Sequence, residues 1–332
     1  MLTEPRWDEK SFKIVKNRRL NIIKQRKTSA QSVAFNALSK QLYGRDHPAS
    51  TPVGGTEESV ESITMNDIKN YFKENISPQV SHFHVAGKMT QSTIEKSLQQ
   101  LSKNWIGSNV EIPQIKTSKP PTRARVYFID IPGAKQSAIT LGSLSIPGGN
   151  PELYKYSVVN NRLGGGMEAR LMRTLRLEKG YTYGAGSFYR ENSYQTPFYA
   201  YSQVRSNVTL ESLEIFKNII NGYAKSYNSE DLELTKNKLI KQNALRFERL
   251  GSLLNMLDTI SKFNFPDTYI QRQQDVLTSM SLEEAKSIAE SQFNADKMYF
   301  VVAGDAKTQL SRIKELGYGN PIMLDREGNK IK

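Results

Sequence analysis

An internal repeat on the scale of a whole domain is the feature that most constrains the fold of this chain. The segment Ser62–Met65 resembles Ser279–Leu282, which lies 217 positions later in the 332-residue sequence. Reading on at the same offset without gaps gives further matches: Lys69 with Lys286, Phe83 with Phe300, and Val85-Ala86-Gly87 with Val302-Ala303-Gly304. Because a repeat of this size sets the whole architecture, we interpret the chain as a tandem duplication.

The same offset holds upstream and preserves the order of the predicted elements. The tripeptide Ile23-Lys24-Gln25 matches Ile240-Lys241-Gln242, and each lies within a long helical pattern. Both copies then place Ser or Thr three residues before an acid, which predicts a helix start (Thr64 with Asp67, Ser281 with Glu284). An apolar strand that ends at glycine follows in each copy, at Ser81–Ala86 and Met298–Ala303.

The two copies are predicted to differ in length. The first ends near Gly107, and the Pro-rich stretch 108–124 that follows is typical of a linker. A unit as long as the repeat offset, 217 residues, that ends near Gly107 lacks its front half. Residues 1–107 should therefore be mostly helical with one clear strand, His82–Ala86, and should expose strand edges and an apolar helix face. Residues 125–332 should form a complete second copy.

The second copy predicts an α+β fold. Its strands arrive as two hairpin patterns, Arg125–Ile131 with Ser137–Ile146 and Thr182–Arg190 with Thr196–Val204. Helical patterns are grouped after them, from 210 to 263 and from 282 to 293. Strands in hairpins followed by grouped helices indicate tandem units of mainly antiparallel sheet with helices packed on it.

A segment in the second copy resembles a hallmark of the insulinase/pitrilysin/mitochondrial processing peptidase family. The segment runs from Leu163-Gly164-Gly165-Gly166 through Arg176 and Gly180 to Tyr183-Gly184. In that family it belongs to the second domain, which does not bind zinc. The region from Leu42 to Asp67 is similar to the back half of a family domain. The resemblance implies a processing-peptidase-like fold over nearly the whole chain.

The residues of this segment also have a local interpretation. Gly166 should release a turn, Gly180 should end a helix in a left-handed cap, and Leu171 and Leu175 should pack into the core. The reversal at Gly180 should bring the side chains that flank it to one corner. An alternative, that Gly164-Gly165-Gly166 cradles phosphate, lacks the spaced glycines and the lysine of a phosphate loop.

Arg176 and Tyr183 are the candidate substrate-binding residues. A guanidinium and a phenol are donors that suit a peptide carbonyl, or the oxyanion formed from it. The resemblance implies that these two residues bind substrate and stabilise that oxyanion. The alternative from residue types is an arginine that satisfies helix C-terminal carbonyls beside a buried tyrosine.

The family's zinc motif, H-x-x-E-H, is absent from this sequence. Of the three histidines, His82 and His84 are two apart and should face the same side, which makes them weak metal candidates. The resemblance places a ligand Glu on the helix Phe12–Lys27, where Lys24 stands near the expected position. We therefore expect no zinc in this chain, and zinc in a partner or a missing segment.

Charge and composition bear on the binding partners and the compartment of the protein. Eight basic residues and no acid lie between Lys10 and Lys27, which predicts either the solvated side of a helix that buries Phe12, Val15, Leu20 and Ile23, or a patch for nucleic acid or anionic lipid. The charges lack interleaved aromatic residues, so the solvated helix is favoured. Cysteine, a secretory signal and an apolar run of membrane-spanning length are all absent, which leaves the compartment open.

Two functions follow as predictions. The first is the non-zinc, substrate-binding part of a zinc endopeptidase, which binds unfolded peptide and pairs with a zinc-bearing partner or with another copy of itself. The second is a catalytically inactive peptide-binding or assembly scaffold of the same fold. Intact Arg176 and Tyr183 favour the first, and Lys24 with the absent zinc ligands is compatible with the second.

Overall fold

The computed structural model describes residues 3–331 and divides into two compact units. The helical unit comprises Met1–Gln25, Gly54–Gln114 and Ala244–Asn264. The sheet unit comprises Arg26–Val53, Ile115–Asn243 and Phe265–Lys332. These units do not follow the boundaries 1–107, 108–124 and 125–332 expected from the repeat, because each takes in segments from both halves of the sequence.

The sheet unit is built on a six-stranded mixed sheet with the order β3-β4-β2-β5-β1-β6. Its strands are β1 (Arg125–Asp130), β2 (Gln136–Leu144), β3 (Thr182–Tyr189), β4 (Pro197–Arg205), β5 (Tyr299–Gly304) and β6 (Ile322–Leu324). The pairs β3·β4, β4·β2 and β2·β5 are antiparallel, whereas β1 runs parallel to both β5 and β6. The expected α+β fold is confirmed.

One predicted strand pairing is wrong. The sequence suggested that β1 and β2 form a hairpin, but β5 lies between them. Phe300 of β5 pairs with Val126 on one side and with Leu141 on the other. The run Tyr299–Ala303 is apolar along its whole length, as expected of a central strand that is buried on both faces. The hairpin between β3 and β4 is confirmed.

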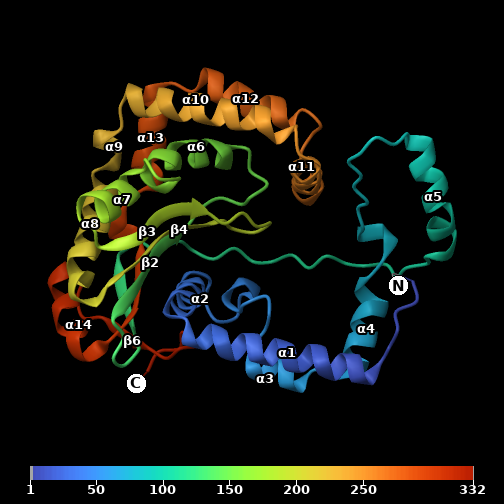
Figure 1. Ribbon diagram of the computed structural model, residues 1–332, viewed down its shortest axis with the longest axis horizontal. Helices are drawn as coiled ribbons and strands as arrows, with labels where there is room; N and C mark the ends of the chain where they lie inside the picture. The colour runs from blue at the N-terminus through green and yellow to red at the C-terminus, as the bar shows by residue number, and fades with distance from the viewer. Residues whose placement is uncertain (1–2, 332) are drawn as a thin grey trace. The chain divides into compact units, whose positions relative to one another are not determined.

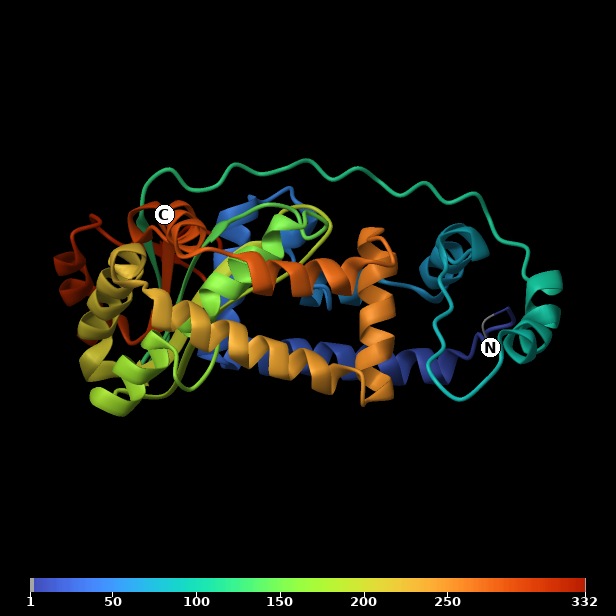
Figure 2. The ribbon, with the colours of Figure 1, turned by 90° about the horizontal axis from the view of Figure 1, so that it is seen from above.

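Helices cover both faces of this sheet (Figure 1). One face carries most of them, and the other carries α2 (Ala30–Tyr43) (Figure 1; Figure 2). The first group comprises α6 (Glu152–Gly164), α7 (Arg170–Met172), α8 (Thr209–Asn221), α9 (Tyr223–Ser226), α10 (Ser229–Arg246), α12 (Tyr269–Ser279), α13 (Leu282–Gln292) and α14 (Ala306–Ile313). The sheet unit also contains four short 3₁₀ turns: η1 (Pro48–Ser50) after α2, η4 (Ser206–Val208) before α8, η5 (Ala295–Lys297) before β5 and η6 (Lys314–Leu316) after α14.

Alternation along the strands creates two hydrophobic cores. Val126 and Phe128 of β1 face the larger group of helices, whereas Tyr127 and Ile129 face α2. Helix α2 contributes its small apolar side chains, Val33, Ala34, Ala37 and Leu38, to the second core. The repeat assigned α2 to the first copy, yet the helix packs on β2 and β5 of the sheet unit.

The helical unit contains most of α1 (Glu9–Thr28), together with α3 (Glu57–Ser62), α4 (Met65–Asn75), η2 (Pro78–Val80), α5 (Gln91–Asn104) and α11 (Leu250–Phe263). The predicted start of α4 is confirmed, because Thr64 Oγ1 accepts a hydrogen bond from the Asp67 amide and the Asp67 carboxylate accepts one from the Thr64 amide. The matching cap in the sheet unit is also confirmed, since Ser281 accepts from the Glu284 amide.

Two expectations for the helical unit are wrong. Residues 81–86 belong to no strand of the described residues, since a strand needs a hydrogen-bonded neighbour and the unit supplies none. Helix α1 buries Ile23, but Val15 is 64% exposed. In the helical unit, apolar side chains that the periodicity predicted to be buried therefore lie exposed.

Candidate functional site

The glycine turn joins α6 to α7 by a close backbone approach. Helix α6 ends at Gly164, where an added Cβ would lie 2.1 Å from the amide nitrogen of Ser187 in β3. Nearby, Asn160 Nδ2 donates to the Ser187 carbonyl at 2.9 Å, and Ser187 Oγ donates to Asn160 Oδ1. Only a residue without a side chain lets the helix and the strand meet here. Gly164 therefore sets how α6 lies on β3.

The next two glycines complete the turn and do not form a phosphate cradle. An added Cβ at Gly165 would meet Asn161 Cα at 2.8 Å, and Gly166 has a φ of 152°. Lys238 Nζ donates to the Gly165 carbonyl at 3.3 Å and to Asn161 Oδ1 at 3.1 Å. The lysine at this turn is thus held by neutral oxygen acceptors of the protein, which supports a structural role for the glycines.

A buried ion cluster fixes the segment that follows the turn. The Asp231 carboxylate, 7% exposed, accepts hydrogen bonds from the guanidinium groups of Arg162 and Arg170. Arg170 also donates to the Ser226 carbonyl at 2.8 Å and lies over the Tyr223 ring, with 4.8 Å from Cζ to the centroid. This cluster joins α6, α7, α9 and α10. The residues of this cluster are too far apart in sequence to produce a local signal, so the cluster was not predicted.

Arg176 lies in a turn of π-helix. Segment η3 (Arg173–Glu178) continues α7 with wider turns, and the Lys179 amide donates to the Thr174 carbonyl, five residues back, at 3.0 Å. Leu171 and Leu175 are fully buried, as predicted. The Arg176 guanidinium is half-buried and donates to Met167 Sδ at 3.8 Å, a weak acceptor. No ion pair engages Arg176 within residues 3–331.

The helix ends as predicted at Gly180, which is left-handed with a φ of 64°. The Tyr181 amide donates to the Leu175 carbonyl at 2.8 Å, and the Arg205 amide donates to the Tyr181 carbonyl at 3.3 Å. These bonds tie the end of η3 directly to the beginning of β3 and to the end of β4. The two candidate residues therefore lie on segments that are joined through the backbone.

Tyr183 lies at a β-bulge in β3. Thr182 pairs with Val204 and Ala185 with Ser202, so that Tyr183 and Gly184 together oppose Gln203. Thr182 Oγ1 accepts from the Gly184 amide at 3.0 Å and donates to the Gln203 carbonyl at 2.6 Å. The Tyr183 side chain is 88% exposed. The alternative of a buried tyrosine is therefore wrong.

The histidines do not form a zinc site. The rings of His82 and His84 lie on the same side, as expected, with centroids 6.1 Å apart and an interplanar angle of 5°. His84 Nε2 is hydrogen-bonded to Ser261 Oγ at 2.7 Å, and His47 Nδ1 accepts from the Ala49 amide. Among the described residues, no group of three or more His, Cys, Asp or Glu side chains could hold a metal ion. With Lys24 in place of an acid, this donor set does not fit zinc.

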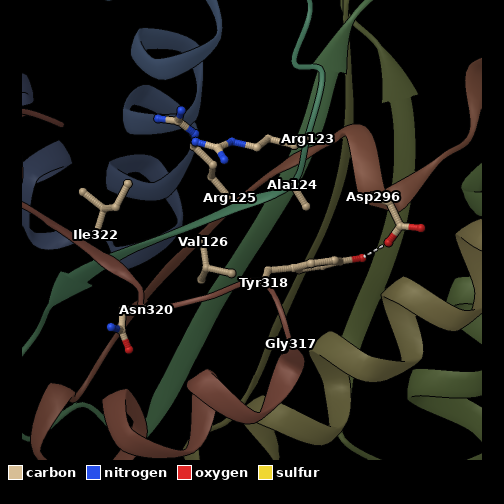
Figure 3. A pocket seen from close by; sticks show the side chains of 9 residues that line it. All are labelled: Arg123, Ala124, Arg125, Val126, Asp296, Gly317, Tyr318, Asn320 and Ile322. Atoms are coloured by element: carbon tan, nitrogen blue, oxygen red, sulfur yellow. Dashed lines mark hydrogen bonds between the residues drawn. The ribbon is translucent and has the colours of Figure 1, made fainter.

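A separate cavity of about 580 Å³ opens beside the start of β1 in the sheet unit (Figure 3). Tyr318 donates to Asp296 Oδ1 at 2.6 Å, and Lys217 Nζ lies 4.6 Å from the Tyr318 ring centroid. Burial, together with the hydrogen bond to Asp296 and its charge, raises the pKa of Tyr318. None of the predicted site residues lines it. Its walls are formed by Arg123, Ala124, Arg125, Val126, Asp296, Gly317, Tyr318, Asn320 and Ile322.

A protein-family model matches more than half of this chain. The model of the family described as the peptidase M16 inactive domain matches residues 62–239. A non-peptidase homolog, YmxG of Helicobacter pylori, is 23% identical over 315 residues, which cover 92% of this chain and 71% of that protein. An uncharacterized zinc protease, YmxG of Bacillus subtilis, is 27% identical over 191 residues, which cover 55% of this chain and 43% of that protein.

Solved structures share the fold. The peptidase M16 inactive domain from Pseudomonas fluorescens has a TM-score of 0.80 at 23% identity and covers 92% of this chain and 73% of its own. A protease from Helicobacter pylori also has a TM-score of 0.80, at 13% identity, and covers 89% of this chain and 72% of its own. Within residues 3–331, no helix has both the length and the apolar character needed to cross a bilayer.

Proposed function

The chain belongs to the family of the peptidase M16 inactive domain, and from that premise we propose that it is the non-zinc, substrate-binding part of a zinc endopeptidase. Arg176 and Tyr183 hold an unfolded peptide, and zinc is supplied by another chain or by a segment outside this one. Because the donor set within residues 3–331 does not fit zinc, the contribution of this chain is to bind and orient the peptide.

The observation that carries this proposal is the exposure of Tyr183 at a bulge whose backbone is fixed. The bulge is held by three hydrogen bonds: from the Gly184 amide to Thr182 Oγ1, from Thr182 Oγ1 to the Gln203 carbonyl, and from Ser202 Oγ to the Gly184 carbonyl. A large aromatic side chain that is 88% exposed gains little from burial within this chain. Bulges that redirect a side chain are frequent next to binding sites. This arrangement supports a role for the phenol in contacting a ligand.

The chemistry of the pair suits a peptide carbonyl. Arg176 offers several N–H donors with a permanent positive charge, and among the described residues its acceptor is a thioether sulfur, Met167 Sδ. The phenol of Tyr183 adds a neutral O–H donor. Charge-assisted hydrogen bonds strengthen as negative charge develops on an acceptor. Two such donors would bind the carbonyl of a substrate and would bind the oxyanion formed from it more tightly.

The edge of the sheet offers a way to align the peptide. Strand β3 is the first strand of the sheet and pairs with β4 on one side only, within the described residues. An extended peptide that added beside β3 would gain main-chain hydrogen bonds without sequence preference. The bulge interrupts this edge at Tyr183, so the side chain would meet the peptide where regular pairing stops.

Peptide binding by the purified chain tests the proposal. A labelled unfolded peptide would be titrated and followed by fluorescence anisotropy. Tyr183→Phe removes only the hydroxyl and should weaken binding about 3- to 10-fold, which corresponds to one hydrogen bond. Arg176→Gln removes a charged donor and should weaken binding about 10- to 100-fold.

Leu177→Ala is the matched control, because Leu177 is an exposed neighbour of Arg176 with no polar group. Its affinity should equal that of the unsubstituted chain. Equal affinities for all four proteins would refute the role of Arg176 and Tyr183. The unsubstituted chain should cleave no peptide alone but should support cleavage when a zinc-bearing family partner is added.

The second candidate function is a non-catalytic scaffold of the same fold. It is favoured by the lysine at position 24 and by the absence of a metal-binding group among the described residues. The assay with a zinc-bearing partner separates the two functions. A scaffold would assemble with the partner without changing the rate of cleavage, and Arg176→Gln would then have no effect on that rate.

A further inference from the structure

The helical unit has almost no hydrophobic core of its own. Its buried apolar side chains, among the described residues, are Ile23, Val60 and Met256. Both hydrophobic clusters of the molecule consist of sheet-unit residues. The helical unit nevertheless carries the same amphipathic elements that build the core of the sheet unit. This contrast calls for a physical explanation.

The repeat shows which exposed side chains of the helical unit correspond to buried side chains of the sheet unit. Each exposed residue of the helical unit can be compared with the residue 217 positions later in the sheet unit. Val15 is 64% exposed and its counterpart Leu232 is 4% exposed, Tyr71 is 63% against 8% for Ile288, and Phe83 is 66% against 0% for Phe300. All three counterparts belong to the larger core. The paired positions are therefore equivalent in the repeat, and they differ in whether other side chains pack over them.

Helix α11 shows the same deficit on a second surface. Leu250 and Leu254 are 57% and 37% exposed. At the same offset they correspond to Val33 and Ala37 of α2, which are 1% and 0% exposed because α2 packs on β2 and β5. The helical unit thus has residues for both faces of a sheet. It has no strand among its described residues to place between them.

We propose that these two uncovered surfaces, one formed by Val15, Tyr71 and Phe83 and the other by Leu250 and Leu254, dock a polypeptide from outside this chain that folds like the segment Arg125–Ser226. In the sheet unit that segment supplies β1, β2, β3 and β4 with α6, α7, α8 and α9. The docked polypeptide would add strands on both sides of residues 81–86, whose counterpart β5 lies between β1 and β2. This proposal is independent of the roles of Arg176 and Tyr183.

The length of a related protein and the pairing of β1 and β2 favour this occupant over a second copy of the chain. The Helicobacter pylori relative extends beyond its match, which covers 71% of it, so more than a quarter of that protein lies outside the match. A second copy would have to offer strands equivalent to β1 and β2, yet both are already paired on their two sides. Their hydrogen-bonding groups are therefore not free to pair with residues 81–86.

Thiol labelling tests the proposal on the full chain, because the sequence contains no cysteine. Phe83→Cys would place one thiol on the first uncovered surface, and Leu254→Cys would place one thiol on the second. Leu234→Cys is the matched control, since Leu234 is an exposed leucine on a helix of the sheet unit. Two probes would be added separately: the N-terminal third of the Helicobacter pylori relative, and the segment Arg125–Ser226 of this chain as a separate polypeptide.

We expect at least one probe to slow maleimide labelling at positions 83 and 254 by tenfold or more and to leave position 234 unchanged. Hydrogen exchange should then show new protection of the amides of residues 81–86. Unchanged labelling with both probes would overturn the proposal. Slow labelling without a probe that becomes slower as the chain is concentrated would also overturn it, because a second copy would then be the occupant.

Discussion

Replacing Gly164 with alanine tests whether the glycine turn is required by packing. The added Cβ would lie 2.1 Å from the Ser187 amide nitrogen and 2.7 Å from the Gly186 carbonyl carbon. Both are backbone atoms of β3, so neither can rotate away as the end of a flexible side chain would. The helix and the strand must therefore separate to admit the methyl group.

The magnitude follows from two contributions. Forcing an extra carbon into a packed site costs about 1–3 kcal/mol. Separation also stretches the two hydrogen bonds between Asn160 and Ser187, each of which contributes about 1 kcal/mol. We expect Gly164→Ala to lower the free energy of unfolding of the sheet unit by about 3 kcal/mol, which corresponds to a fall in Tm of about 6–12 °C.

Two other glycines of the same segment supply matched controls. Gly180 has a φ of 64° and open space around it, so Gly180→Ala should cost only the left-handed conformation, about 1–2 kcal/mol. Gly184 has neither a positive φ nor a neighbour within 4 Å of an added Cβ, so Gly184→Ala should change stability by less than about 0.5 kcal/mol. The expected order of destabilisation is Gly164, then Gly180, then Gly184.

Thermal unfolding followed by near-UV circular dichroism is the appropriate assay. Both tryptophans, Trp7 and Trp105, lie in the helical unit, so tryptophan fluorescence would not report on the sheet unit. The buried tyrosines Tyr199, Tyr223 and Tyr227 report on the sheet unit instead. If Gly164→Ala melts at the same temperature as Gly184→Ala, the close approach of α6 to β3 is not a constraint on this position.

Three further predictions concern the interactions that support the site. Asp231→Asn removes the negative charge shared by two partly buried guanidinium groups. It should lower the free energy of unfolding of the sheet unit, measured in urea, by about 3 kcal/mol. A decrease of less than about 0.5 kcal/mol would show that the cluster contributes little to stability. Burial and the charge of Asp231 raise the pKa of Tyr227 to about 12. The unfolded tyrosine ionises near pH 10, so stability should be full below pH 10 and fall by about 3 kcal/mol up to pH 12, with a shallower fall in Tyr227→Phe. Thr182→Val removes the hydroxyl that bridges Gly184 and Gln203. Peptide affinity should fall about 3- to 10-fold, which corresponds to the loss of one hydrogen bond that orders the bulge. Unchanged affinity would contradict a positioning role for the bulge.

The sequence predicted features that depend on neighbours along the chain. The caps at Thr64 and Ser281, the left-handed Gly180, and the burial of Leu171 and Leu175 all follow from residue type and spacing. The mixed α+β fold followed from the order of helix and strand patterns. In each case the deciding interaction lies within a few residues, where local periodicity and capping rules apply.

Features set by distant contacts were not predicted. The strand β5 enters the sheet between β1 and β2 from more than 150 residues later in the sequence, and the apolar pattern of a strand does not name its neighbours. The π-helical turn at Arg176 and the bulge at Tyr183 are irregularities that residue propensities do not encode. A weak signal for the bulge exists, since Thr182 and Gly184 flank Tyr183, but the same triplet fits a regular strand.

These two irregularities lie on either side of Gly180 and bear on what the segment is for. A π-turn is a rare departure from regular α-helix, and a bulge leaves a residue without a ladder partner, so both backbones are locally less favourable than regular structure. The chain opposes this loss with specific bonds: the Tyr181 amide to the Leu175 carbonyl, and the Thr182 hydroxyl to its neighbours. Neither set of bonds adds burial for Arg176 or Tyr183. Both irregular backbones leave their side chains outside the core: Arg176 has no ion-pair partner among the described residues, and Tyr183 is exposed to solvent. This arrangement supports the proposal that the two residues contact a ligand.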